Sequence, residues 1–202
     1  MQFTAIHRML GLEPQPLTRQ IIDDAVAARL AEQPDLDWKR ERYEGKADWQ
    51  EEFAKDVAAM ANTGGGLLVL GINEHRHTSE ADTIAGVQPL SDSDERTLRQ
   101  VAFSRIAPPV SGIAFANMVG EDGACVVAVW VPPSSDVPHL VYRQALFGAP
   151  FRDGTRTEWM REQQIQAAYR RRFDARSDQG ATLDALWDEL SVNSPSDRRI
   201  AS

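Results

Sequence analysis

Asp37 and Lys39 are an acid and a base separated by one residue, and together they could take part in catalysis. They stand in Leu36-Asp37-Trp38-Lys39, an alternating stretch typical of a β-strand, where every second side chain lies on one face. Leu36 and Trp38 would face the core, and the acid and the lysine would lie together on the other face. The same acid-x-lysine order occurs in many DNA nucleases. It is also common on exposed strand faces, where it stabilises little, so it needs support from the rest of the chain.

Arginine residues are concentrated in the last third of the chain. Between Val141 and Arg176 there are eight arginines and four acidic residues, in a protein of formal net charge −8. Such a local positive excess would suit a groove for a nucleic-acid backbone, with Arg152 and Arg156 as the candidate contacts. Arginines near the end of a helix also favour its dipole and face water, which is the alternative for Arg170–Arg172. The net charge argues against non-specific coating of nucleic acid, but not against a nuclease.

Two further motifs have a chemical and a structural interpretation. Gly64-Gly65-Gly66 lacks the lysine of a phosphate-binding loop and precedes an apolar run instead of opening a helix. We interpret it as a helix stop and a tight turn, which leaves a nucleotide-binding domain as a third alternative. His75 and His77 flank Arg76 directly after Glu74, where they would contact a metal ion or phosphate, or simply face water.

Helices and strands are expected to alternate along the chain. Apolar spacing predicts helices at 18–33, 48–61, 91–106 and 159–173, and apolar runs predict strands at 36–39, 67–72, 113–119 and 124–131, with a hairpin turn at 121–123. A short strand pair is expected within 140–151, whereas 73–90 is polar and is expected to be a loop. This order predicts an α/β or α+β domain, a mixed β-sheet flanked by helices.

Length and composition limit the class of protein. With 202 residues, 42% apolar and 26% charged, the chain is neither disordered, collagen-like nor a coiled coil. We expect a lead-in at 1–17, one domain at 18–174 and a tail at 175–202 that is partly helical or disordered, with further domains beyond Ser202 left open. The single Cys125 excludes an internal disulfide and a cysteine-bound zinc site. We see no signal peptide and no apolar run near the roughly 18 residues that span a bilayer, so we expect a cytoplasmic protein.

Several separated motifs, in the same order, resemble the Schlafen/AlbA-like domain family over about residues 30–170. They are Glu32 with Leu36-Asp37-Trp38-Lys39, then Phe53 to Gly65 ending in Ala61-Asn62-Thr63-Gly64-Gly65, then Leu70-Gly71-Ile72-Asn73-Glu74, Ile106-Ala107-Pro108-Pro109 and Arg152-Asp153-Gly154-Thr155-Arg156-Thr157. The chain departs from the family pattern at some positions. Asp37 replaces a glutamate, Trp38 a phenylalanine or tyrosine, and Met60 a phenylalanine, and the last acid is Glu74 instead of an aspartate.

The resemblance implies a metal-dependent ribonuclease that acts on transfer RNA and similar structured RNA. Carried over residue by residue, Glu32, Asp37 and Glu74 would hold Mg²⁺ or Mn²⁺, hard cations that prefer oxygen ligands in nuclease sites. Lys39 would orient the attacking water or stabilise charge on the scissile phosphate. Each acidic position of the family keeps a carboxylate here, although the Asp37 side chain is one methylene shorter.

The leading hypothesis is therefore a Schlafen-like nuclease that hydrolyses phosphodiesters of RNA, or of single-stranded DNA. Two related lobes form a clamp in eukaryotic Schlafens, so the resemblance implies that this single lobe works as a homodimer. Such an activity would suit antiphage defence or a stress response. The alternative is a non-catalytic nucleic-acid-binding module of a transcriptional regulator, which would bind without cleaving and be indifferent to a chelator.

Overall fold

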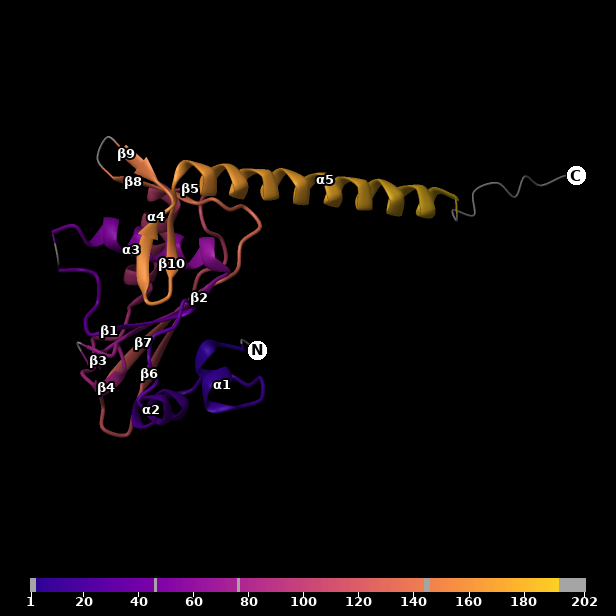
Figure 1. Cartoon of the computed structure of the whole chain (residues 1–202). Coiled ribbons are helices and arrows are strands. Elements are labelled where there is room, and N and C mark those ends of the chain that lie inside the picture. Colours follow the sequence, from indigo (N-terminus) through magenta and orange to yellow (C-terminus); the bar gives the residue numbers. More distant parts are fainter. Residues whose placement is uncertain (1–2, 46, 76, 144–145, 193–202) are drawn as a thin grey trace, which may run out of the picture.

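The computed structural model describes residues 3–45, 47–75, 77–143 and 146–192 (Figure 1). The helices are α1 (Ala5–Leu10), α2 (Arg19–Ala27), α3 (Trp49–Thr63), α4 (Asp92–Arg105) and α5 (Glu162–Val192). The strands are β1 (Leu36–Lys39), β2 (Gly66–Leu70), β3 (Ile72–Glu74), β4 (Ala81–Ile84), β5 (Ile106–Ala107), β6 (Ala114–Val119), β7 (Cys125–Val131), β8 (Leu140–Arg143), β9 (Leu146–Gly148), β10 (Pro150–Asp153) and β11 (Arg156–Trp159).

A mixed sheet of order β1-β2-β7-β6 forms the centre of the fold. β1 runs parallel to β2 with Leu36 opposite Leu67, and β7 is antiparallel to both β2 and β6. The turn between β6 and β7 closes with the Gly123 N–H donating to Gly120 O, where the sequence predicts a hairpin. The expected α+β architecture with a mixed sheet is confirmed.

Both faces of this sheet are covered, which explains the continuous apolar run in β2. Leu68 and Leu70 pack in a core cluster with α3 and α4, whereas Leu67 and Val69 pack in a second cluster with α1 and α2. Figure 1 shows α3 and α4 on the side of the sheet opposite α1 and α2. A strand buried on both faces gains nothing from alternating polar residues, so its sequence is apolar throughout.

The glycine turn after α3 is a helix stop, as expected. Gly64 has the left-handed φ of 110° that ends the helix. Gly65 has φ +88°, and a Cβ there would lie 2.6 Å from the backbone nitrogen of Pro133. This close approach of two backbones is a steric reason for glycine and needs no bound phosphate.

Asn62 and Thr63, just before this turn, connect α3 to the second half of the chain. The Asn62 amide donates to His139 O (3.0 Å) and Pro150 O (2.7 Å), and its Oδ1 accepts the His139 N–H (2.7 Å). Thr63 Oγ1 accepts the backbone N–H of Arg152 (2.8 Å). The Asn-Thr-Gly-Gly motif therefore fixes the start of β10 against the end of α3.

Asn62→Ala is expected to lower the free energy of unfolding by about 2–3 kcal/mol, because it leaves an N–H and two carbonyls without their partners. Urea denaturation measures this. Asn73→Ala is the control, since the Asn73 amide makes one exposed bond to Thr83 Oγ1 and should change stability by about 0.5 kcal/mol or less. Equal losses in the two variants would contradict the role of Asn62.

Two expectations for residues 18–90 are wrong. The segment 73–90 is not all loop, because β3 and β4 pair as an antiparallel hairpin with Asn73 opposite Thr83. One face of this hairpin is solvated and carries polar residues, so the segment lacks the apolar run by which the other strands were predicted. Helix α2 ends at Ala27 rather than near 33, and Glu32 lies in the connection to β1, where its N–H donates to Ser79 O (2.9 Å).

The last helix also differs from expectation. Trp159 belongs to β11, opposite Pro150, and α5 starts at Glu162 and continues through residue 174 to Val192. No proline interrupts the sequence between 162 and 192, and the single Gly180 weakens a helix without ending it. Positions 193–202 of the expected tail lie outside the described residues. In the described part of the chain, no helix is both long and apolar enough to cross a membrane.

Candidate functional site

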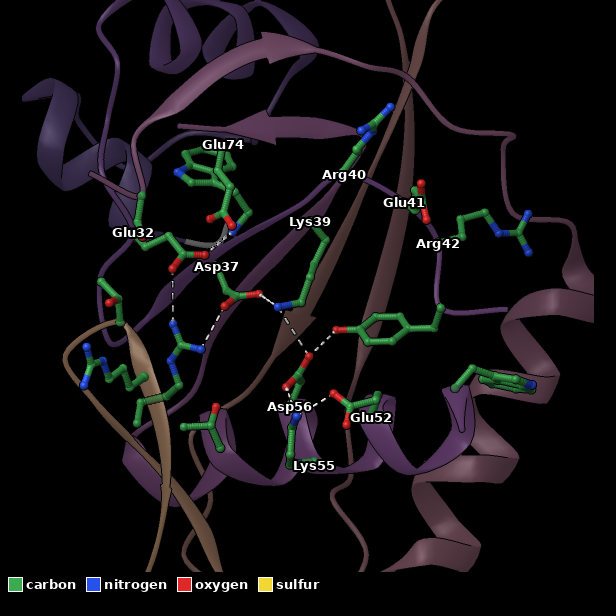
Figure 2. A pocket seen from close by; sticks show the side chains of 18 of the residues that line it. Glu32, Asp37, Lys39, Arg40, Glu41, Arg42, Glu52, Lys55, Asp56 and Glu74 are labelled. Carbon is green, nitrogen blue, oxygen red and sulfur yellow. Dashed lines mark hydrogen bonds and ion pairs between the residues drawn. The ribbon is translucent and has the colours of Figure 1, made fainter. Parts of the chain in front are cut away.

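One open cavity of about 840 Å³ lies between β1, α3 and the β10–β11 hairpin (Figure 2). Its lining includes the expected metal ligands, the expected catalytic lysine and the two expected backbone contacts, namely Glu32, Asp37, Lys39, Glu74, Arg152 and Arg156. The first and last of the motifs that carry these residues are more than a hundred positions apart in the chain. The fold brings them to one place.

Asp37 and Arg152 form a buried ion pair at the base of this cavity. Arg152 Nη1 donates to Asp37 Oδ1 at 2.8 Å, and the two side chains are 4% and 3% exposed. β10 packs on α3 and carries Arg152 over the second face of β1. The interpretation of Asp37 as part of an exposed strand face is therefore wrong.

Lys39 shares its strand face with Asp37, as the alternation predicts. Lys39 Nζ lies 2.5 Å from Asp37 Oδ2 and 3.5 Å from Asp56 Oδ2 (Figure 2). Burial alone would lower the pKa of Lys39, but the charges of Asp56 and Asp37 outweigh it and raise the pKa above its ordinary value. Lys39 is therefore a firmly protonated cation in the cavity.

The pKa of Glu32 is also shifted by its surroundings. Burial, and then the charges of Asp37 and Glu74, raise its pKa to about 8, against the lowering effects of the Trp38 N–H and Lys39. Glu32 Oε1 accepts that Trp38 N–H at 3.0 Å, and Oε2 lies 4.0 Å from Arg152 Nη2. At neutral pH the carboxyl is mostly protonated as long as no further cation joins it.

Asp56 and Tyr43 belong to the site but were not singled out from the sequence. Tyr43 Oη donates to Asp56 Oδ2 at 2.8 Å, and burial raises the pKa of Asp56. Asp56 lies three residues after Phe53 and four before Met60, on the buried face of α3. An acid within an apolar helical stripe was the signal available in the sequence.

Glu74 and Arg156 lie at the exposed rim. Glu74 ends β3, and its charge contributes to the raised pKa of Glu32. Arg156 begins β11, opposite Asp153. The rings of His75 and His77 lie 5.9 Å apart, and His77 lines the cavity. Arg76 between them lies outside the described residues.

These residues suit Mg²⁺ or Mn²⁺ by their chemical type, but their present arrangement does not form a metal site. Carboxylates are the ligands that such cations prefer, and Glu32, Asp37 and Glu74 line one cavity. Arg152 and Lys39 already neutralise Asp37, and among the described residues no three acidic, histidine or cysteine side chains are arranged to hold a metal ion. The donor set fits in kind, and an ion would have to displace Arg152.

Arg152 is incompletely satisfied in its present position. Its Nε and Nη2 are buried and have no hydrogen-bond partner among the described residues. Unmet donors on a buried guanidinium are costly, so Arg152 keeps hydrogen-bonding capacity that its present contacts do not use.

The central mixed sheet, the helices on both of its faces and the hairpin carrying Arg152 form an α+β domain. Residues 32–161, more than half of the chain, match the Schlafen, AlbA_2 family. The protein belongs to this family, and the resemblance seen in its motifs is confirmed. Membership associates the domain with nucleic acid.

Two other comparisons complete these findings. A comparison with curated proteins gives no match. Among solved structures, the solution NMR structure of the N-terminal domain of a RecG-related protein from Nitrosomonas europaea is similar, with 19% identity and a TM-score of 0.48. The similarity covers 68% of this chain and 88% of that chain.

Proposed function

We propose that this domain binds nucleic acid across the cavity and hydrolyses its phosphodiester bonds, with Mg²⁺ or Mn²⁺ held by Glu32, Asp37 and Glu74. The observation that carries the proposal is that these carboxylates line the same cavity as Lys39 and Arg156. Family membership supports nucleic acid as the ligand. RNA is the favoured substrate because the family resemblance points to it, with single-stranded DNA second.

In the proposed reaction the acidic side chains would hold the metal ion, and the basic side chains would contact the phosphate. A bound divalent ion would polarise the phosphate and lower the pKa of its water. Lys39 stays protonated and stabilises negative charge that develops on the phosphate. Arg156 at the exposed rim would contact the nucleic-acid backbone, and Arg152, whose Nε and Nη2 lack hydrogen-bond partners among the described residues, lines the same cavity.

A non-catalytic nucleic-acid-binding module is the second candidate, and one observation favours it. Arg152 and Lys39 neutralise Asp37 in the present arrangement, so the acids need no metal to be stable. A domain of this kind would use Arg156 for binding alone. Its affinity would depend on salt and not on a chelator.

Cleavage of end-labelled transfer RNA, single-stranded RNA and single-stranded DNA, with Mn²⁺, Mg²⁺ or EDTA, tests the proposal. Glu32→Gln and Asp37→Asn keep the size of each side chain and should each reduce metal-dependent cleavage by about a hundredfold or more. Glu121→Gln, on the exposed β6–β7 turn, should leave cleavage unchanged.

Each outcome of this experiment decides between the candidates. Cleavage that persists in EDTA, or in both cavity variants, would overturn the proposed site. A salt-sensitive gel shift with no cleavage under any metal would favour the binding module. Cleavage of DNA but not RNA would keep the site and reverse the proposed substrate.

A further inference from the structure

Helix α5 extends far beyond the body of the domain. It has 31 residues and is therefore about 46 Å long, and Figure 1 shows it leaving the body at one end. Ala168 and Arg172 are buried against the body, where the Arg172 guanidinium donates to the carbonyl oxygens of Val137 and Pro138 at 2.8 Å. From 177 to 187 every described side chain is exposed.

The exposed part of α5 carries large apolar side chains. Phe173 is 61% exposed, Leu183 60%, Leu186 50% and Trp187 71%. Tyr169, Phe173, Arg176, Gly180, Leu183 and Trp187 follow one another at alternating intervals of three and four residues. This is the spacing of a coiled-coil seam. The body covers only its first part, where Tyr169 is half-buried and Arg176 pairs with Asp136 at 2.7 Å.

Charge is segregated along the same helix. Residues 161–176 hold five arginines and two acids, whereas residues 177–190 hold four acids and no basic residue. In a parallel pair of such helices, like charges would lie side by side. In an antiparallel pair, the basic half of each helix would lie beside the acidic half of the other.

We propose that α5 pairs antiparallel with α5 of a second copy of this chain. In one register, each seam residue of one helix lies opposite a seam residue of the other. Phe173 of one copy lies opposite Leu183 of the other, Tyr169 opposite Trp187, and Arg176 opposite Gly180. Each contact occurs twice by symmetry, as a two-fold interface requires. The same register places Arg170 beside Asp184 at the edge of the seam.

The antiparallel arrangement explains why a glycine occurs at position 180. A glycine inside a helix costs about 1 kcal/mol relative to alanine, so its place in the exposed half of α5 is otherwise unfavourable. Opposite the long side chain of Arg176, a residue without a side chain lets the two helices approach. The antiparallel register thus accounts for the small residue as well as for the large ones.

Sedimentation equilibrium of the full chain measures the proposed dimer. The wild type should have twice the mass of the chain, and Leu183→Lys should sediment as a monomer. The side chain of Leu183 is 60% exposed, so this variant should keep its fold, with an unchanged circular dichroism spectrum. Phe103→Lys is the control, because Phe103 is 67% exposed on α4 and should leave the dimer intact.

Charge reversal tests the orientation. Arg170→Asp should weaken the dimer by placing two acids side by side, and the double variant Arg170→Asp with Asp184→Arg should restore it. Both positions are exposed, so neither change disturbs a core. A monomeric wild type, or a dimer that Leu183→Lys leaves intact, would overturn the proposal. A dimer that is lost in the single variant and not restored in the double would overturn the antiparallel register. None of these outcomes depends on nuclease activity.

Discussion

Arg152→Ala is expected to lower the free energy of unfolding by about 3 kcal/mol, because it leaves Asp37 buried without its guanidinium partner. The pair is 4% and 3% exposed, so water cannot replace the missing donor. Lys39 remains 2.5 Å from the other oxygen of Asp37, which keeps the loss at the lower end for a broken buried pair. Urea denaturation at neutral pH measures it.

Arg8→Ala is the matched control for this loss. Arg8 makes two hydrogen bonds to Asp35, at 2.9 and 3.0 Å, but the side chains are 52% and 35% exposed. An ion pair of this exposure contributes about 1 kcal/mol or less. If Arg152→Ala and Arg8→Ala destabilise the protein equally, the buried network does not hold the β10–β11 hairpin on the body.

A double variant distinguishes the effect of charge on stability from the effect of packing. Replacing both partners by apolar residues of similar size, Arg152→Met with Asp37→Leu, should recover much of the loss, because no uncompensated charge remains in the core. A double variant as unstable as Arg152→Ala would mean that the shape of the side chains matters more than their charge.

The elements that local sequence determines were predictable. β2 was recognised because a strand buried on both faces is apolar at every position, and the end of α3 because glycine occupies its left-handed stop. The β3–β4 hairpin was missed because its polar residues resemble a loop. Helix α5 was cut short because the run Arg170-Arg171-Arg172 was interpreted as the end of a helix, where basic residues favour the dipole.

The candidate site was predictable residue by residue but not as an arrangement. The motifs supply Glu32, Asp37 and Arg152, yet the contact between Asp37 and Arg152 joins positions 115 residues apart in the chain. No spacing rule reveals such a pair, so the sequence alone left an exposed strand face open as the alternative to a site for Asp37. Asp56 shows the converse, since its conflict with the apolar face of α3 was visible in the sequence and marks a polar network beneath.

Glu32→Gln is expected to stabilise the protein increasingly as the pH rises. The pKa of Glu32 is about 8 in the folded state and 4.5 ordinarily, so the folded state holds a proton that the unfolded state releases. Stability therefore falls as the pH rises between these two values, and the full penalty is present above 8. Glutamine cannot ionise and keeps an acceptor for the Trp38 N–H, so it avoids this penalty.

The groups that face Glu32 set the size of this gain. Asp37 and Glu74 disfavour its charge, whereas Lys39 and the Arg152 guanidinium at 4.0 Å favour it. The expected advantage of Glu32→Gln is near zero at pH 4.5 and about 4 kcal/mol at pH 8. Thermal denaturation across this range measures it, with Glu121→Gln, on the exposed turn, expected to follow the wild type. A Glu32→Gln advantage that is constant with pH would show that folding leaves the pKa of Glu32 unchanged, and its carboxylate would then be balanced by Arg152 and Lys39 without an added ion.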